Sequence, residues 1–316
     1  MADRPLPRPA GSVLDLIGNT PMVRLRRIPP AESADVFVKL EALSPGGSIK
    51  DRIALTMIRD AEASGALKAG GTIVEPTAGN TGIGLAMAGV QLGYRVILIV
   101  PEHFSVEKRE LMRALGGEIV LTPRDDGMKG AIARAREVAS SIPGSWVPQQ
   151  FANHSNSRAH YETTGPEIWE QMEGRIDAFL AGSGTGGTFT GTTRYLKERH
   201  RSLHSVIVEP QGSVLQGGEA GPHEVEGIGA SFVPEVLDLS LADEFVTVDD
   251  PPAFVMVRRL AAEEGILSGS SGGANVHAAI AVAIRLGRGK RVVTVIPDSS
   301  ERYLSKGIYS KWGDIA

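Results

Sequence analysis

Short runs of β-branched and apolar residues alternate with helical patterns along most of this chain, and this alternation constrains the fold more than any other feature. Several runs are apolar on both faces, as in strands of a parallel sheet that helices cover on both sides. The pattern predicts an α/β fold with right-handed crossovers. The expected strands are Asp35–Leu40, Thr72–Glu75, Arg95–Val100, Glu118–Leu121, Asp177–Ala181, Ser205–Glu209 and Arg291–Ile296. The expected helices are Lys50–Ser64, Gly82–Leu92, Val106–Leu115, Met128–Ala139, Ala159–Met172, Gly187–Arg199, Ala253–Glu264 and Gly273–Leu286.

The length of 316 residues is too great for one ordinary core and predicts two domains or one large α/β unit. We expect two α/β domains with parallel-rich sheets flanked by helices. We find no repeat and no low-complexity linker, so the boundary is placed near residues 149–153, between two strand–helix series. The N-terminal domain is expected to comprise residues 35–150, and the C-terminal domain residues 11–34 and 151–316. A cleft between the two is the expected ligand site.

Composition excludes several classes of function. The chain has no cysteine, which excludes disulfides, thiolate nucleophiles and cysteine-ligated metals, and no pair among its seven histidines has HExxH spacing. A net charge of −4 provides no basic field for nucleic acid. The longest strongly apolar run, Val96–Val100, is too short for a bilayer, and Met1–Ala10 lacks the apolar core of a signal peptide. We therefore expect a cytoplasmic protein with small-molecule substrates and without a metal, a membrane or a nucleic-acid partner.

A lysine follows a Gly-Gly turn at the start of an expected helix, in the segment PGGSIKDR at residues 45–52. The partial positive charge of a helix N-terminus disfavours an ammonium at Lys50. A lowered pKa is what a lysine needs to form an imine at neutral pH. The ordinary alternative is a solvated lysine that pairs with Asp51.

Three further loops of small residues each precede an expected helix: EPTAGNTG at 75–82, GSGTGGT at 182–188 and GSSGGA at 269–274. Free N–H groups at a helix start suit a carboxylate or a phosphate. Helix capping is the ordinary alternative, by Thr77 or Asn80 in the first loop and by a serine in the last. Together with Lys50, the loops supply a lysine, a carboxylate site, a phosphate site and a serine donor. That set fits a cofactor with one phosphate, one aldehyde and one ring nitrogen.

The second of these loops also permits a different class of enzyme. Gly182, Gly184 and Gly187 satisfy G-x-G-x-x-G, and Glu209 ends the next expected strand, where a ribose-binding acid could lie. A nicotinamide-dependent oxidoreductase is therefore one alternative, and a catalytically idle partner protein is another. The nicotinamide interpretation leaves the other three loops unexplained.

The motifs GGSIKDR, EPTAGNTGIG, GSGTGGT and EGIG, in this order, resemble the fold-type-II pyridoxal-phosphate enzymes of the cysteine synthase and cystathionine β-synthase group. The resemblance extends from LDLIGNTP at residues 14–21 to DSSERY at residues 298–303. It implies a fold like the tryptophan synthase β chain, with pyridoxal 5'-phosphate in the cleft. It also implies β-replacement on O-acetylserine or serine through an aminoacrylate. Homocysteine would give cystathionine and sulfide would give cysteine, and a dedicated cysteine synthase is the alternative. Family members are usually homodimers, so a homodimer is expected.

The resemblance also assigns residue roles. Lys50 would hold the cofactor as a Schiff base and remove the α-proton, Asn80 would hydrogen-bond the ring hydroxyl oxygen, and Ser271 would face the pyridine nitrogen. The cofactor phosphate would be held by Gly184, Thr185, Gly186, Gly187 and Thr188. The substrate carboxylate would be surrounded by Thr77, Ala78, Gly79, Thr81 and Gln150. The mouth of the site would be lined by Gly227, Ile228 and Gly229.

One residue departs from the common form of the family. Ala78 makes the loop TAGNT where TSGNT is usual, so one hydroxyl near the substrate is missing. A smaller bacterial subgroup with TAGNT resembles O-acetylserine-dependent cystathionine β-synthases, and EHFS at 102–105, TPRDDGM at 122–128 and EPQGS at 209–213 are similar to it. Ala230, where animal cystathionine β-synthases carry an aromatic residue, is instead similar to a cysteine synthase. O-acetylserine is therefore the expected donor, and homocysteine is expected to be accepted as well as sulfide.

Overall fold

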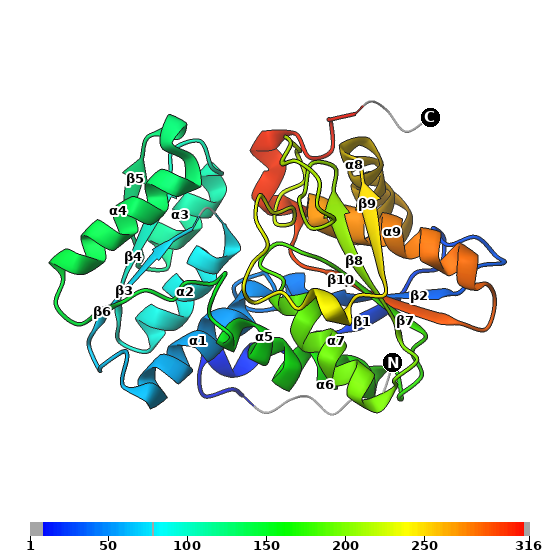
Figure 1. Cartoon of the computed structure of the whole chain (residues 1–316), viewed down its shortest axis with the longest axis horizontal. Coiled ribbons are helices and arrows are strands. Elements are labelled where there is room, and N and C mark those ends of the chain that lie inside the picture. The colour runs from blue at the N-terminus through cyan, green and yellow to red at the C-terminus, as the bar shows by residue number, and fades with distance from the viewer. Residues whose placement is uncertain (1–8, 78, 313–316) are drawn as a thin grey trace.

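The computed structural model describes residues 9–77 and 79–312, and their strands form two separate sheets (Figure 1). The larger sheet has the order β1-β2-β10-β7-β8-β9, in which β1 pairs antiparallel with β2 and the other described pairs are parallel. Its strands are β1 (Met22–Arg24), β2 (Asp35–Leu40), β7 (Ala178–Gly182), β8 (His204–Pro210), β9 (Glu244–Val248) and β10 (Arg291–Ile296). The smaller, parallel sheet has the order β5-β4-β3-β6. Its strands are β3 (Thr72–Pro76), β4 (Arg95–Pro101), β5 (Glu118–Thr122) and β6 (Ser145–Trp146).

Helices cover both faces of each sheet, as a parallel sheet requires. The α-helices are α1 (Lys50–Ser64), α2 (Asn80–Gln91), α3 (Val106–Ala114), α4 (Gly127–Ser141), α5 (Ser155–Ala159), α6 (Gly165–Gln171), α7 (Gly187–Arg199), α8 (Asp250–Arg259) and α9 (Ser270–Leu286). π-Helical turns at His160–Thr164 and Leu260–Glu264 continue α5 into α6 and extend α8. Short 3₁₀ turns lie at Val13–Leu16, Glu41–Leu43, Arg124–Asp126, Leu239–Leu241 and Ser300–Lys306.

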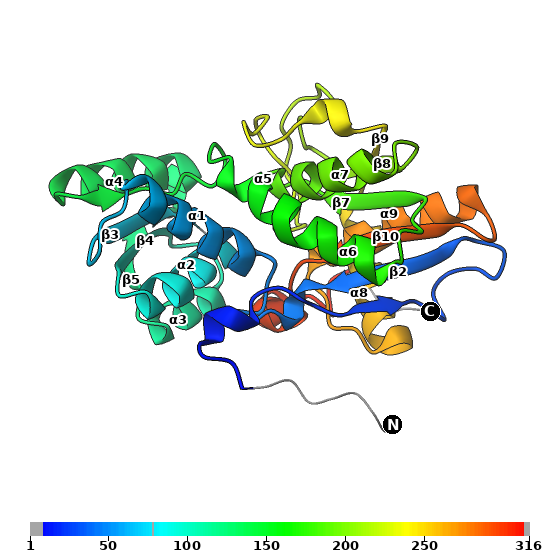
Figure 2. The same cartoon turned by 90° about the horizontal axis from the view of Figure 1, so that it is seen from below.

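The side chains of each central strand alternate between two buried layers. In β7, Ala178 and Leu180 pack in the core formed with α8 and α9, whereas Phe179 and Ala181 pack in the core formed with α6 and α7. Figure 2 shows these helices beside the larger sheet. The smaller sheet has the same construction, with α1, α2 and α3 in one core and α4 in the other. The α/β fold class predicted from the alternating pattern is confirmed.

All seven expected strands are present, each within one residue of its expected bounds. Three strands were not expected: β1, β6 and β9, and each lies at the edge of its sheet. Edge strands are short and partly exposed, so they lack the continuous apolar run that reveals a central strand. In β1, for example, two of the three residues are exposed.

Strand β2 does not belong with the smaller sheet, although the predicted N-terminal domain began at residue 35. It pairs in parallel with β10 over its whole length, and Val36 and Val38 are buried in the core of the larger sheet. The boundary at residue 35 is corrected on this point, because the partner of β2 lies near the other end of the chain. The remainder of the domain division stays a prediction.

Helix α2 is buried nearly all round, as its apolar sequence predicts, and it lies directly against α1. A Cβ atom added to Gly84 would lie 3.0 Å from the backbone carbonyl oxygen of Lys50. Glycine at this position therefore lets α2 approach the first turn of α1, the turn that carries Lys50. Among the described helices, none is long and apolar enough to span a membrane.

Candidate active site

Lys50 is the first residue of α1 and lines a pocket in the interior of the molecule. The pocket is lined by Ile49, Lys50, Ala181, Gly182, Gly184, Thr185, Gly186, Thr188, Gly227, Ile228, Asn275, Val295 and Pro297. It therefore brings together the predicted lysine, four residues of the predicted phosphate loop and two of the predicted mouth. These residues come from α1, the β7–α7 loop and the segment after β8, which are far apart in the sequence.

The loop before Lys50 is attached to the segment that follows β10. The N–H of Ile49 donates to the carbonyl oxygen of Pro297 at 2.9 Å, and Ser48 forms an antiparallel bridge with Asp298. Burial lowers the pKa of Lys50 to about 8, while the nearby Asp298 carboxylate opposes this by raising the pKa. More of Lys50 is thus an uncharged amine at neutral pH than in an ordinary lysine, as a nucleophilic lysine requires.

Glycines in the loop between β7 and α7 let neighbouring groups lie very close to its backbone. Gly186 has the left-handed φ of 83° just before α7 begins. A Cβ atom on Gly184 would lie 2.3 Å from the carbonyl oxygen of Gly227, and one on Gly187 would lie 1.9 Å from Oδ1 of Asn156. Only glycine fits these two positions without a shift of their neighbours. The first N–H groups of α7 have no intrahelical acceptor, so the loop can bind a phosphate.

Two buried residues behind this loop were not predicted. The amide nitrogen of Asn156 donates to the carbonyl oxygen of Gln150 at 2.8 Å and to the hydroxyl of Thr185 at 3.0 Å. Nε2 of His160 lies 3.2 Å from the hydroxyl of Thr188. Burial, with the nearby Lys50 and Arg52 cations, lowers the pKa of His160, so its ring is neutral at pH 7. No motif marks either residue: His160 lies within an expected helix, and Asn156 lies just before it.

The predicted substrate-carboxylate residues gather at the end of β3. Thr77 and Thr81 are buried, and the Thr81 hydroxyl donates to Oε1 of Gln150 at 2.6 Å. The N–H of Gly79 donates to the Thr77 hydroxyl at 3.3 Å. Ala78 lies outside the described residues. Gly79, not a capping side chain, precedes the first residue of α2, so the capping alternative is not found there.

A buried carboxylate, that of Glu75, bonds the backbone of the segment that carries Gln150. Glu75 is the penultimate residue of β3 and accepts the N–H groups of Gln149 and Gln150 at 3.0 and 3.3 Å. Burial raises the pKa of Glu75 to about 7, although the two N–H groups oppose that shift. Glu75 was not predicted as a site residue, and its signal was a lone acid at the end of an apolar strand.

Asn80 and Ser271 each lie in the first turn of a helix. Nδ2 of Asn80 donates to Oδ2 of Asp298 at 2.7 Å, and Nη1 of Arg302 donates to Oδ1 of Asn80 at 2.6 Å. Ser271 is buried, and its hydroxyl oxygen lies 3.7 Å from the place that a Cβ atom on Gly227 would occupy. Gly269 precedes α9 without a side-chain cap, so Ser271 does not cap this helix.

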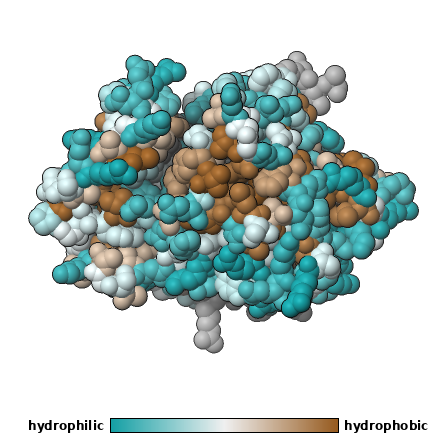
Figure 3. Space-filling view, viewed as in Figure 1, coloured by the Kyte–Doolittle hydropathy of each residue, from teal (hydrophilic) through white to brown (hydrophobic). Residues whose placement is uncertain are grey.

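The predicted mouth segment lies over the β7–α7 loop. Gly227 and Gly229 have φ values of 91° and 90°, and the N–H of Gly229 donates to the carbonyl oxygen of Ser183 at 3.0 Å. Phe232 and Val233, which follow, are 50% and 49% exposed. Apolar surface also gathers near the middle of the face drawn in Figure 3. The approach to the mouth is therefore partly apolar.

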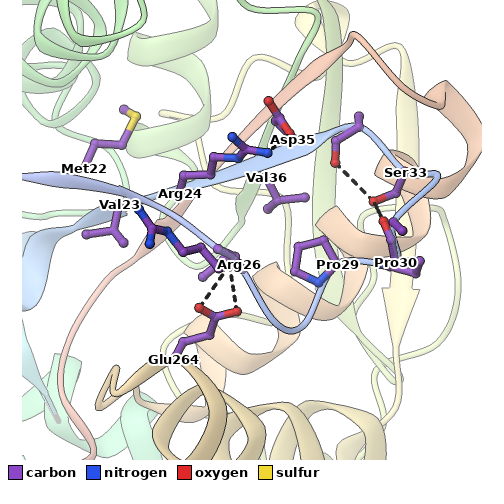
Figure 4. Close-up of a pocket in the computed structure, with 13 residues that line it drawn as sticks. Met22, Val23, Arg24, Arg26, Pro29, Pro30, Ser33, Asp35, Val36 and Glu264 are labelled. Atoms are coloured by element: carbon purple, nitrogen blue, oxygen red, sulfur yellow. Dashed lines mark hydrogen bonds and ion pairs between the residues drawn. The ribbon is translucent and has the colours of Figure 1, made fainter.

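A larger groove lies along β1, and none of the described residues predicted for the site line it. One of its two carboxylates, Glu264, accepts the N–H groups of Arg26, Arg27 and Ile28 at 3.0, 2.7 and 2.9 Å, and Figure 4 draws the bonds from Arg26. These bonds hold the segment between β1 and β2 against the end of the extended α8. Glu264 therefore has a structural function.

Comparisons with known proteins give a consistent result. The family described as "Pyridoxal-phosphate dependent enzyme" matches residues 13–298. The chain is 50% identical to the O-acetylserine dependent cystathionine beta-synthase of Bacillus subtilis over 94% of this chain and 97% of that protein. It is 50% identical to a cysteine synthase of Staphylococcus aureus over 96% and 98%.

Two solved structures are similar throughout. The O-acetylserine dependent cystathionine beta-synthase of Helicobacter pylori has a TM-score of 0.90 and 45% identity, and the match covers 96% of this chain and 99% of that one. An O-ureido-L-serine synthase has a TM-score of 0.93 and 43% identity, with 98% of each chain covered. Sequence and structure thus lead to the same group of proteins.

Proposed function

Because this chain belongs to the pyridoxal-phosphate-dependent enzyme family, we propose that it performs β-replacement on O-acetylserine with a thiol as the second substrate. The family, the cofactor and the enzyme class expected from the four motifs are confirmed. The nicotinamide alternative is set aside, since the matching family uses a different cofactor.

The observation that carries the proposal is Lys50, with its lowered pKa, in the same pocket as the glycine loop before α7. Lys50 would bind the aldehyde carbon, and the N–H groups of Gly184, Gly186 and Gly187 with the hydroxyls of Thr185 and Thr188 would bind the phosphate. We propose Asn80 for the ring oxygen and Ser271 for the ring nitrogen. When bound, pyridoxal phosphate withdraws the charge that remains on Cα after proton removal.

Lys50 would be both the attachment point and the base. Without cofactor, Lys50 has a pKa of about 8, so a useful fraction is neutral and would be able to accept the α-proton. The carboxylate of Asp298 favours the resulting ammonium. Acetate would leave with the electrons of the Cβ–O bond, the thiolate sulfur would form the new bond at Cβ, and the Lys50 ammonium would return its proton to Cα. A neutral Ser271 beside the ring nitrogen favours this elimination over transamination.

The remaining loops would orient the substrate. We propose that Thr77, Ala78, Gly79, Thr81 and Gln150 surround its carboxylate, and the Thr81–Gln150 hydrogen bond supports this. Gly227, Ile228 and Gly229 would line the mouth, where the positive φ values of the two glycines support a tight turn.

The substrates can be tested directly. We expect a higher kcat/KM for O-acetylserine than for serine with both sulfide and homocysteine, because acetate is a far better leaving group than hydroxide. The names of relatives support either thiol, since they include O-acetylserine dependent cystathionine beta-synthases and a cysteine synthase. Faster turnover of serine would contradict the proposed donor. Absence of cystathionine at saturating homocysteine would leave sulfide as the thiol.

We also propose a cytoplasmic homodimer, as is usual for the family. The outer edge of β1 has no strand partner among the described residues, which supports a contact there. Sedimentation should give twice the chain mass of 33.4 kDa. If the protein sediments at the monomer mass throughout the micromolar concentration range, the proposed dimer is contradicted.

A further inference from the structure

We propose that Asp298 and Arg302 are positioning residues that fix the side-chain amide of Asn80 toward the cofactor. The inference rests on the proposed function, in which Asn80 hydrogen-bonds the ring oxygen of pyridoxal phosphate. Neither residue was given a role by its sequence motif. Both lie just after β10, whereas Asn80 opens α2 in the other half of the molecule.

The two contacts hold both ends of one amide. Nδ2 of Asn80 donates to the Asp298 carboxylate at 2.7 Å, and Oδ1 of Asn80 accepts from the Arg302 guanidinium at 2.6 Å. A reversed amide would place its N–H groups against the guanidinium and its oxygen against the carboxylate, so the two charges select one orientation. An amide nitrogen carries two hydrogens. Asp298 uses one, which leaves the other for a ligand oxygen.

Asp298 and Arg302, which together form a clamp on the Asn80 amide, are themselves held by further hydrogen bonds. Asp298 is 1% exposed, and the hydroxyl of Tyr303 donates to the same carboxylate oxygen as Asn80 does. Arg302 donates to the carbonyl oxygen of Gly46, in the turn before Lys50. The backbone N–H of Gly269 donates to the carbonyl oxygen of Asp298 at 3.1 Å. The clamp thus connects the loops that carry Lys50, Asn80 and Ser271.

The second oxygen of Asp298 argues against a purely structural role. Oδ1 is buried and has no hydrogen-bond partner among the described residues. A Cβ atom on Gly269 would lie only 2.1 Å from it, so the backbone there is in close contact with the carboxylate. A buried acceptor without a partner costs free energy. Packing alone does not explain a charged residue here, whereas orientation of Asn80 does.

The test measures the cofactor itself, without substrate. In Asp298→Ala the amide of Asn80 loses one of its two fixed ends. We expect about tenfold weaker pyridoxal-phosphate binding, the order of one lost hydrogen bond, and a shifted visible absorption band. Arg302→Met frees the other end and should have the same effect. Asp298→Asn keeps an acceptor oxygen for Asn80 but removes the charge beside Lys50, so its loss of cofactor affinity should be smaller than that of Asp298→Ala.

Tyr303→Phe is the matched control. It removes a hydrogen bond to the same carboxylate but leaves the Asn80 contact, so it should lower Tm without a change in cofactor affinity or absorption. In the double variant Asn80→Ala/Asp298→Ala, cofactor affinity should equal that of Asn80→Ala alone. Additive losses, or wild-type affinity in both Asp298→Ala and Arg302→Met, would overturn the inference. If the wild-type protein binds pyridoxal phosphate normally but performs no β-replacement, the proposed function is contradicted, whereas the inference about Asp298 and Arg302 is not.

Discussion

Lys50 has an unusual set of neighbours for a lysine, because burial favours its neutral form while a single carboxylate favours its charged form. That balance suits a group that must form an imine and later hold a proton. Lys50→Ala should remove the visible band of the lysine-bound cofactor. It should also lower turnover at least ~10³-fold, since imine donor and base are lost together. Absorption spectra and initial rates measure the two effects.

The exposed Lys68 offers a control for this variant. Lys68→Ala should leave both the spectrum and the rate unchanged. Full activity of Lys50→Ala would remove the central assignment of the site.

The raised pKa of Glu75 gives the protein a characteristic pH dependence. Its ordinary value of 4.5 applies to the unfolded chain, and burial raises the folded value to about 7. Between these values the folded protein binds the extra proton, so the free energy of unfolding falls as pH rises through this window. The full effect of Glu75 is about 3 kcal/mol at an order-of-magnitude level. Asp51, whose pKa burial raises to about 6, contributes in the same direction.

Denaturant titrations between pH 4.5 and 8 measure this slope. Glu75→Gln cannot release the proton, so its free energy of unfolding should fall less over the same range. The contribution of Asp51 and the opposite contribution of His160, whose pKa burial lowers, remain in the variant. Equal slopes in the two proteins would show that Glu75 does not titrate in this window.

Individual site residues could be predicted where a glycine-rich motif marked them. Lys50 and Thr188 lie in the first turns of helices, directly after short glycine-containing loops, so local spacing was informative. Asn156 and His160 act through contacts with Thr185 and Thr188, and such contacts depend on how two helices pack. Asp298 lies at the carboxyl end of a parallel strand, where ligand sites gather, and that position was its only signal.

At the scale of elements, α1 is connected to the larger sheet by a buried group of charges. Arg52 pairs with Glu41 at 2.7 Å and with Glu167 at 2.6 Å, and Glu167 also accepts from Lys39 at 2.7 Å. Lys39, Glu41 and Arg52 are at most 2% exposed. Because Arg52 lies two residues after Lys50, these pairs connect the first turn of α1 to β2 and α6.

Removal of one partner from this group should be costly. Arg52→Ala leaves the buried Glu41 without its cation and Glu167 with Lys39 alone, and we expect the free energy of unfolding to fall by about 3–5 kcal/mol. Arg59→Ala, on the same helix, breaks an exposed pair with Glu62 and should cost less than about 1 kcal/mol. Urea titrations of both variants give the comparison. Similar losses in the two would mean that burial adds nothing to the Arg52 pairs.

The elements themselves were largely predictable because central strands and amphipathic helices have local patterns. The edge strands β1, β6 and β9 were missed, since they are short or half exposed. The π-helical turns within two expected helices were also missed. A single such turn is too short for an apolar pattern to distinguish it from the α-helix around it. Strand pairing was the largest gap, because the partner of β2 lies about 250 residues away in sequence.

At the scale of the whole molecule, the smaller half contacts the larger one through α3. Nζ of Lys108, 3% exposed, lies 3.2 Å from the Glu226 carboxylate, which also pairs with Lys306. Glu226 directly precedes the mouth residue Gly227. This carboxylate therefore connects the position of α3 to the mouth of the site.

Loss of that charge should loosen α3. In Glu226→Gln we expect amide hydrogen exchange in α3 to become about tenfold faster, with no change in β7, because local opening becomes easier. Glu224→Gln breaks a pair with Lys311 within the larger half and should leave exchange in α3 unaltered. Unchanged α3 exchange in both variants would show that the Lys108 contact does not limit its motion.

The position of β10 determines when the enzyme can first become active during its synthesis. β10 is the last strand of the chain, yet it lies between β2 and β7 within the larger sheet. The smaller sheet uses only residues 72–146, so it can assemble while translation continues. The larger sheet must wait for its final strand, and the Lys50 loop must wait with it because Ile49 is bonded to Pro297. Cofactor binding therefore requires β10 to be in place, and we expect a chain that stops short of residue 296 to be inactive.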